Sequence, residues 1–314
     1  MLALVSGPPI QDSPFRSILR VRPMRAGVSC LAGLILLSVS LTAQRPILRS
    51  VFIEAAGADD KLLTDLTAAD VEVTESGIPR KVVRVTPGSA PMRIVLMVDS
   101  SNPVLPVVNS VKTALRTFVD ALPPVHEVTF ISSGGQIRVR TPPGRDRERL
   151  QAEVASFAPQ GGANAFLDTM LEADTRFFKT APEFWPVFVI VTTDNGENYR
   201  EPDVATYNAF MTDFRARAGT VHAVILQGKR TGPVSVVIAN LTDNVDGTRT
   251  VMNTDNSLPA RMKEIAGRLA ADHEKMRGRY EVAFEGDPAV VQPVVAVAIA
   301  REGGRVLMSV RRPF

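Results

Sequence analysis

Between positions 93 and 277 the chain alternates short apolar runs with stretches of helical periodicity. The run 94–98 is continuously apolar and ends at Asp99, which is typical of a strand buried on both faces of a sheet. Valines and leucines at spacings of three and four follow and predict a helix over 104–119. Further strands are predicted at 127–132, 136–141, 187–194 and 220–227, and further helices at 145–157, 164–179 and 203–217. This alternation favours an α/β fold with a doubly wound, mostly parallel sheet.

Two later segments also read as helices. The run 234–241 is β-branched, which favours a strand, but it precedes the predicted strand 248–252, and the order of elements favours a helix. We predict a helix there. Residues 257–277 carry a single apolar stripe, with Ser257 expected to cap the helix and Pro259 suited to its first turn.

Both flanks of this region alternate with period two. The N-terminal segment 46–88 and the C-terminal segment 279–314 read as short strands, and Glu302–Gly304 predicts a hairpin turn between the last two of them. Each set is too small to form a core by itself. We therefore expect the two sets to pack into one small β domain beside an α/β domain at 91–278.

Charge removes one class of function. The whole chain has 36 basic and 33 acidic residues, but positions 1–43 contain four of the former and one of the latter. The remainder has 36 − 4 = 32 basic and 33 − 1 = 32 acidic residues, and it contains no basic run. Binding to nucleic acid is therefore not expected.

Residues 1–43 read as a signal peptide. Three arginines precede an apolar stretch that ends in small residues before Gln44, and Met24 is an alternative start. The stretch is short for a membrane span, although an uncleaved anchor is the alternative. The single cysteine, Cys30, lies inside this leader, so the mature protein would have no disulfide. We expect an exported protein that is periplasmic, at the cell surface or secreted.

Three loops that follow predicted strands or turns carry oxygen-bearing side chains. They are the segments 99–103 (DSSNP), 160–168 (QGGANAFLD) and 192–198 (TTDNGEN). In an open α/β sheet the carboxyl ends of the strands form the ligand-binding edge, so these loops should converge there. Gly161-Gly162 lacks the Lys-Ser/Thr pair of a phosphate loop and is predicted to form a tight turn.

The order and spacing of these loops resemble the von Willebrand factor type A (VWA) domain and its metal-ion-dependent adhesion site, over about residues 46–312. Asp99 and Ser101 match the start of the D-x-S-x-S motif, Asn164 falls where a threonine is expected, and Asp194 matches the third-loop acid. The resemblance is to secreted bacterial VWA-related proteins. It implies an Mg²⁺ or Mn²⁺ ion that captures a carboxylate from a protein partner.

The chain departs from the motif at two positions. Pro103 replaces the second serine and offers no ligand, and Asn164 replaces the threonine with an amide oxygen. The resulting hypothesis is a degenerate adhesion site that binds metal weakly or has lost it.

Function then follows from the site. We expect a non-enzymatic binding protein that recognises a protein partner or an envelope component. A structural envelope protein without metal and a metal-dependent hydrolase using Asp99 are the alternatives. The hydrolase lacks an acid/base partner, because His126, His222 and His273 show neither metal spacing nor a nucleophile motif. His222, on an apolar strand, is expected to be a core residue, and Glu197 and Glu201 are read as solvated loop charges.

Overall fold

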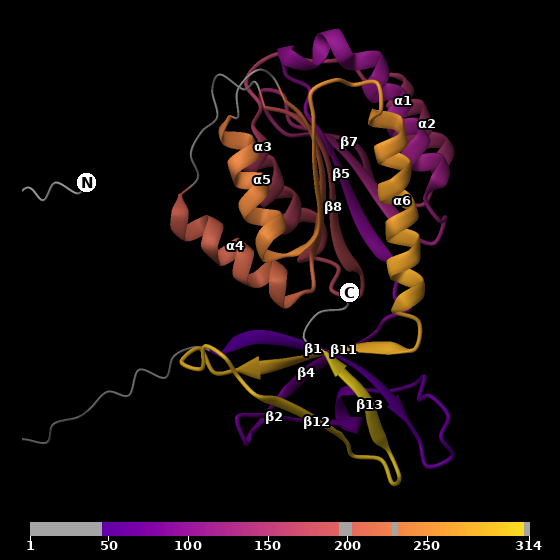
Figure 1. Cartoon of the computed structure of the whole chain (residues 1–314), viewed down its shortest axis with the longest axis vertical. Coiled ribbons are helices and arrows are strands. Elements are labelled where there is room, and N and C mark those ends of the chain that lie inside the picture. Colours follow the sequence, from indigo (N-terminus) through magenta and orange to yellow (C-terminus); the bar gives the residue numbers. More distant parts are fainter. Residues whose placement is uncertain (1–45, 195–202, 228–231, 311–314) are drawn as a thin grey trace, which may run out of the picture. The chain divides into compact units, whose positions relative to one another are not determined.

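A six-stranded sheet with helices on both faces forms the centre of the computed structural model, which describes residues 46–194, 203–227 and 232–310 (Figure 1). Its strand order is β10-β9-β8-β5-β6-β7, and every pairing is parallel except β6 with β7. The strands are β5 (Met92–Val98), β6 (Glu127–Ser132), β7 (Arg138–Gly144), β8 (Trp185–Thr193), β9 (Thr220–Leu226) and β10 (Asp246–Met252). The expected doubly wound, mostly parallel sheet is confirmed.

Alternate residues of the central strand β5 serve two separate cores. Ile94 and Leu96 pack into one hydrophobic cluster, and Val95 and Met97 pack into the other. The first face is covered by α1 (Val108–Ala121), α2 (Arg147–Ala155) and α6 (Leu258–Lys275), and the second by α3 (Phe166–Ala173), α4 (Val204–Ala216) and α5 (Pro233–Asn244). The period-two burial of an all-apolar strand is what two covered faces require.

Helix starts differ in detail from the sequence expectations. The first helix begins as a 3₁₀ turn, η2 (Asn102–Val107), because Pro103 and Pro106 withhold backbone donors there. The predicted helix 164–179 is α3 continued by a π-helical turn, η3 (Asp174–Phe178). Ser257 occupies the cap position of α6 but makes no side-chain capping hydrogen bond, so that expectation was wrong. Pro259 does lie in the first turn of α6.

Strands from the N-terminal and C-terminal segments alternate within two antiparallel sheets. One sheet has the order β13-β1-β11-β4 and the other β12-β2-β3. The strands are β1 (Ile47–Ala56), β2 (Val71–Glu75), β3 (Ile78–Arg80), β4 (Val82–Pro87), β11 (Arg279–Gly286), β12 (Val295–Ile299) and β13 (Arg305–Val310), with a 3₁₀ turn η1 (Ala68–Asp70). Strands from both ends of the chain share one hydrophobic cluster that includes Val51, Val73 and Val282.

The predicted hairpin between the last two strands does not form. A turn at Gly303 is present, but β12 pairs with β2 and β13 pairs with β1, so the two strands enter different sheets. The reason is that β1 and β2 each offer an unfilled edge, and filling both edges satisfies more backbone groups than one two-stranded ribbon would.

The leader, including Met24 and Cys30, lies outside the described residues, as do Glu197 and Glu201. Among the residues that are described, no helix is both long and apolar enough to cross a bilayer.

Candidate functional site

Asp99 joins the first loop to the end of strand β8. Its Oδ1 accepts a hydrogen bond from the backbone N–H of Ser101 at 2.8 Å. Its Oδ2 accepts from the backbone N–H of Thr193 at 3.1 Å and from the Thr193 hydroxyl. The side chain is 1% exposed. Both carboxylate oxygens therefore already have protein partners, and the charge is held at the carboxyl edge of the sheet by three donors.

Ser101 is the exception at this edge. The residue is 1% exposed, and its hydroxyl has no hydrogen-bond partner among the described residues. It stands at the start of η2 but does not cap that turn through its side chain. An unpaired buried hydroxyl costs about 1–3 kcal/mol, and the Ser101 oxygen has no hydrogen-bonding use among the described residues.

Asn164 connects strands β6 and β8 through its amide. Its Oδ1 accepts from the Ser133 hydroxyl at 2.8 Å, and its Nδ2 donates to the Thr192 hydroxyl at 2.9 Å. The residue is buried, and its backbone forms a bridge with Gly134. The amide oxygen that would serve a metal thus already accepts one hydrogen bond.

Asp194 is directed at helix α5. Its carboxylate accepts from the backbone N–H groups of Gly232 at 2.7 Å and Ser235 at 3.1 Å, and also from the Ser235 hydroxyl. Gly232 is the N-cap of α5 and has no side chain to cap it. The carboxylate therefore provides the missing cap and complements the positive end of the helix dipole.

The first and second loops touch through glycines. Gly161 and Gly162 have φ values of +79° and +76°, which confirms the predicted tight turn. A Cβ on Gly161, in the second loop, would lie 3.2 Å from Asn102 Oδ1 in the first. The backbone N–H of Gln160 donates to the Ser100 carbonyl at 2.7 Å. The two loops are thus locked to each other by backbone contacts.

These contacts test how well the predicted ligands fit a divalent cation. Asp99 and Ser101 lie together, and Asn164 reaches them through Thr192 and Thr193, whereas Asp194 makes its hydrogen bonds to α5. Within the described part of the chain, no three His, Cys, Asp or Glu side chains are grouped as a metal site would need. Mg²⁺ takes about six oxygens, and this set offers one unpaired hydroxyl and carboxylates that are already bonded. The residues fit a metal only in part.

Sequence reasoning missed the partners of these ligands. Thr192 and Thr193 adjoin Asp194 in a loop that the sequence singled out, and hydroxyls at the end of a buried strand were a usable signal. Ser235 lies 41 positions from Asp194, so only the fold could have paired them.

The histidines lie towards the opposite edge of the sheet. His222 is buried, as expected, and its Nδ1 is 3.0 Å from the Thr248 hydroxyl. His126 accepts from the backbone N–H of Met92 at 3.2 Å, and its ring meets that of His273 edge-on at 4.7 Å. Burial lowers the pKa of both His126 and His222 to about 4. They are neutral packing groups at physiological pH.

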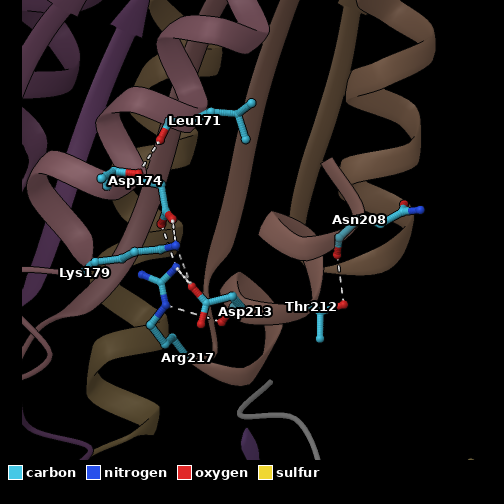
Figure 2. Close-up of polar contacts among 8 residues, drawn as sticks. Leu171, Asp174, Lys179, Asn208, Thr212, Asp213 and Arg217 are labelled. Atoms are coloured by element: carbon cyan, nitrogen blue, oxygen red, sulfur yellow. Dashed lines mark hydrogen bonds and ion pairs between the residues drawn. The ribbon is translucent and has the colours of Figure 1, made fainter. Parts of the chain in front are cut away.

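A cluster of paired charges also lies away from the loops, where α3 and α4 end (Figure 2). Arg217 donates to Asp174 at 2.7 Å and to Asp213 at 3.2 Å, and Lys179 lies 3.2 Å from Asp213. Burial raises the pKa of Asp174, and the charge of Arg217 opposes that rise. Because acids and bases match within the cluster, it links the ends of α3 and α4 and offers no excess charge to a ligand.

Comparisons with known proteins concern the fold. No protein-family model matches the chain, and no curated protein matches it. A solved structure described as von Willebrand factor type A from Catenulispora acidiphila is 14% identical, with a TM-score of 0.48, covering 86% of this chain and 73% of that one.

Two further structures are similar over more than half of the chain. BatB from Bacteroides thetaiotaomicron is 15% identical, with a TM-score of 0.42, covering 57% of this chain and 99% of that one. Proximal thread matrix protein 1 from the mussel byssus, solved with zinc in its adhesion motif, is 15% identical, with a TM-score of 0.45, covering 58% of this chain and 48% of that one. The chain is similar to these three structures at TM-scores below 0.5, and nothing about its own ligands or role follows from that similarity.

Proposed function

We propose that this chain is an exported, non-enzymatic binding protein of the VWA type with a degenerate metal-ion-dependent adhesion site. Its contact surface would be the carboxyl edge of the six-stranded sheet, and its partner a protein or an envelope component. The observation that carries the proposal is the contrast at this edge. Among the described residues the Ser101 hydroxyl has no partner, while Asp99, Asn164 and Asp194 make internal hydrogen bonds.

The internal bonds explain how the edge keeps its shape. Asp99 ties the first loop to β8, Asn164 ties β6 to β8, and Asp194 ties β8 to α5. Backbone N–H groups and hydroxyls of the protein itself stabilise both carboxylates and hold the loops together. A divalent cation at Ser101 and Asp99 would have to displace these bonds, so weak binding is expected.

The same contacts argue against a hydrolase. Hydrolysis needs a general acid or base within about 3 Å of the reacting group. All three histidines lie nearer the amino ends of the strands, and Asp99 is engaged by Thr193 and Ser101. Among the described residues this edge offers no available base, which supports recognition as its function. A structural envelope protein would keep the same fold, but substitutions at the carboxyl edge of the sheet would then not change partner binding.

Calorimetric titration of the chelated, purified chain with Mg²⁺ and Mn²⁺ tests the degenerate site. We expect no saturable binding below the millimolar range, which is the weak end of protein sites for such hard cations. Ser101→Ala should leave this result unchanged. Micromolar binding that Ser101→Ala abolishes would contradict the proposal.

The matched control for that variant is Thr129→Val. Thr129 is fully buried in β6 of the same sheet, and its hydroxyl likewise has no partner among the described residues. The substitution removes a comparable unpaired hydroxyl from the middle of the strand. A thermal melt of both variants with and without chelator should show no metal-dependent shift, because the protein's own hydrogen bonds hold the loops.

A further inference from the structure

Strand β7 brings two arginines to the carboxyl edge of the sheet, beside the loops 99–103 and 160–168 (the adhesion loops). Among the described strands of the sheet, β7 alone runs antiparallel to its neighbour, and its first residue, Arg138, pairs with Ser132 at the end of β6. Arg138 is exposed and Arg140 is half-buried. A parallel strand would have started at the far edge, so the reversed direction of β7 is what places these cations beside the adhesion loops.

Arg140 is held in one position. Its guanidinium lies over the rings of Phe157, at 5.0 Å, and Phe130, at 5.7 Å. It also donates to the Ser132 hydroxyl and to the Ala158 carbonyl, both at 3.3 Å. An arginine ordered by aromatic stacking loses little conformational freedom when it binds an anion. Burial, followed by the charge of Arg138, lowers the pKa of Arg140.

The two arginines share one neutral acceptor. With its amide oriented to meet them, Gln160 accepts from Arg138 Nη1 at 2.5 Å and from Arg140 Nη2 at 3.2 Å. Gln160 belongs to the second adhesion loop and is tied to the first through the Ser100 carbonyl. No carboxylate of the described residues lies within 4.0 Å of either guanidinium, whereas Arg49, Arg84 and Arg217 all have such partners.

We infer that Arg138 and Arg140 form the anion-recognition site of this edge and bind a carboxylate of an acidic segment in the partner protein. The inference rests on the proposed function, because it names the chemistry of the partner that the edge receives. The two guanidiniums converge on Gln160 and have no carboxylate of the described residues within 4.0 Å, although the charge of Glu153 acts on Arg140 from farther away. A carboxylate placed between them would accept from both. The arginines would then perform, without an ion, the carboxylate capture that an intact adhesion site performs through its metal.

The test is fluorescence anisotropy with a labelled hexaglutamate peptide and the full chain, in chelator and at low ionic strength. We expect hexaglutamate to bind and a hexaglutamine peptide of the same length not to bind. Arg138→Gln and Arg140→Gln should each weaken binding about tenfold, since each removes one charge-assisted contact. Arg138 is exposed, so its variant tests the inference even if Arg140→Gln fails to fold.

Arg215→Gln is the matched control. Arg215 is an exposed arginine in the last turn of α4, and its removal changes the net charge equally. We expect an affinity within about twofold of the unaltered chain, because exposed charges act weakly at a distance. Equal weakening by Arg215→Gln, or no binding of hexaglutamate by the unaltered chain, would overturn the inference.

Repeating the anisotropy assay with Mg²⁺ or Mn²⁺ in place of chelator distinguishes failure of the arginine site from failure of the proposed function. Binding that needs Mg²⁺ or Mn²⁺, is lost in Ser101→Ala and survives Arg138→Gln would overturn the arginine site. It would also show that the edge binds carboxylates through metal, which contradicts the degenerate site but keeps the binding function. Binding that Ser101→Ala leaves unchanged and that still depends on the arginines supports both the arginine site and the degenerate metal site.

Discussion

At the scale of single residues, the β sheets depend on one buried acid that sequence reasoning did not single out. Glu75 is fully buried and lies 3.0 Å from Arg49 Nε and 2.9 Å from Arg80 Nη2. It also accepts from the backbone N–H of Asp287 at 2.8 Å. Removing the charge of one partner from such a group leaves the others buried without compensation. We expect Glu75→Gln to lower the free energy of unfolding by about 3 kcal/mol, measured by urea denaturation.

The comparison for this prediction is the same substitution at a surface pair. Glu285 lies 3.0 Å from Lys81 in the same group of strands, and both side chains are substantially exposed. Glu285→Gln should cost no more than about 0.5 kcal/mol, because water screens the pair. Equal losses in the two variants would show that burial does not set the strength of the Glu75 contacts.

At the scale of elements, Asp194 links two parts of the chain that adjoin only in the fold. It caps α5 from the end of β8, with three hydrogen bonds. We expect Asp194→Ala to lower the free energy of unfolding by about 2 kcal/mol, with or without divalent ions, because it leaves buried donors at the helix end unpaired. Asp203→Ala is the control, since Asp203 is the exposed N-cap of α4 and should cost about 1 kcal/mol. An Asp194 effect that appears only when metal is present would mean that the carboxylate serves an ion instead.

Individual helices and strands show how much of the fold could be predicted from the sequence. The run 234–241 is β-branched, yet the order of elements correctly predicted α5, because a parallel sheet needs a crossover between β9 and β10. The turn at Gly303 was predicted from the sequence, but the hairpin predicted with it does not form. The strands that pair with β12 and β13 lie more than 200 positions away, so the sequence pattern could not indicate them. At the candidate site, Asp99 and Asn164 were proposed from the resemblance to the VWA motif, and their hydrogen-bond partners became visible only in the fold. The commitment of Asp194 to Ser235 depends on tertiary contact alone.

At the scale of the whole molecule, two buried histidines connect folding to pH. His126 receives the backbone N–H of Met92 where the central sheet begins, and His222 pairs with Thr248 between β9 and β10. The bond from the Met92 N–H requires an unprotonated Nδ1 on His126, and the bond between His222 and Thr248 can form with a neutral ring. Burial is the main cause that lowers both pKa values to about 4, and nearby positive charges, from His273 and Arg147 at His126 and from Arg268 at His222, add to it. Protonation of either ring therefore opposes the folded state.

The sign of the effect follows from the two pKa values. In the unfolded chain each histidine titrates near 6.5, so between pH 6.5 and about 4 the unfolded state binds more protons. The free energy of unfolding should therefore be at full strength above pH 6.5 and fall as the pH drops towards 4. By linkage, the loss at pH 5 is roughly 1–2 kcal/mol for each histidine. Urea denaturation at pH 7.5, 6 and 5 measures it, and the variant carrying His126→Gln and His222→Gln should lose correspondingly less over the same range. Parallel pH profiles for the two proteins would show that carboxyl groups, and not these histidines, cause the acid sensitivity.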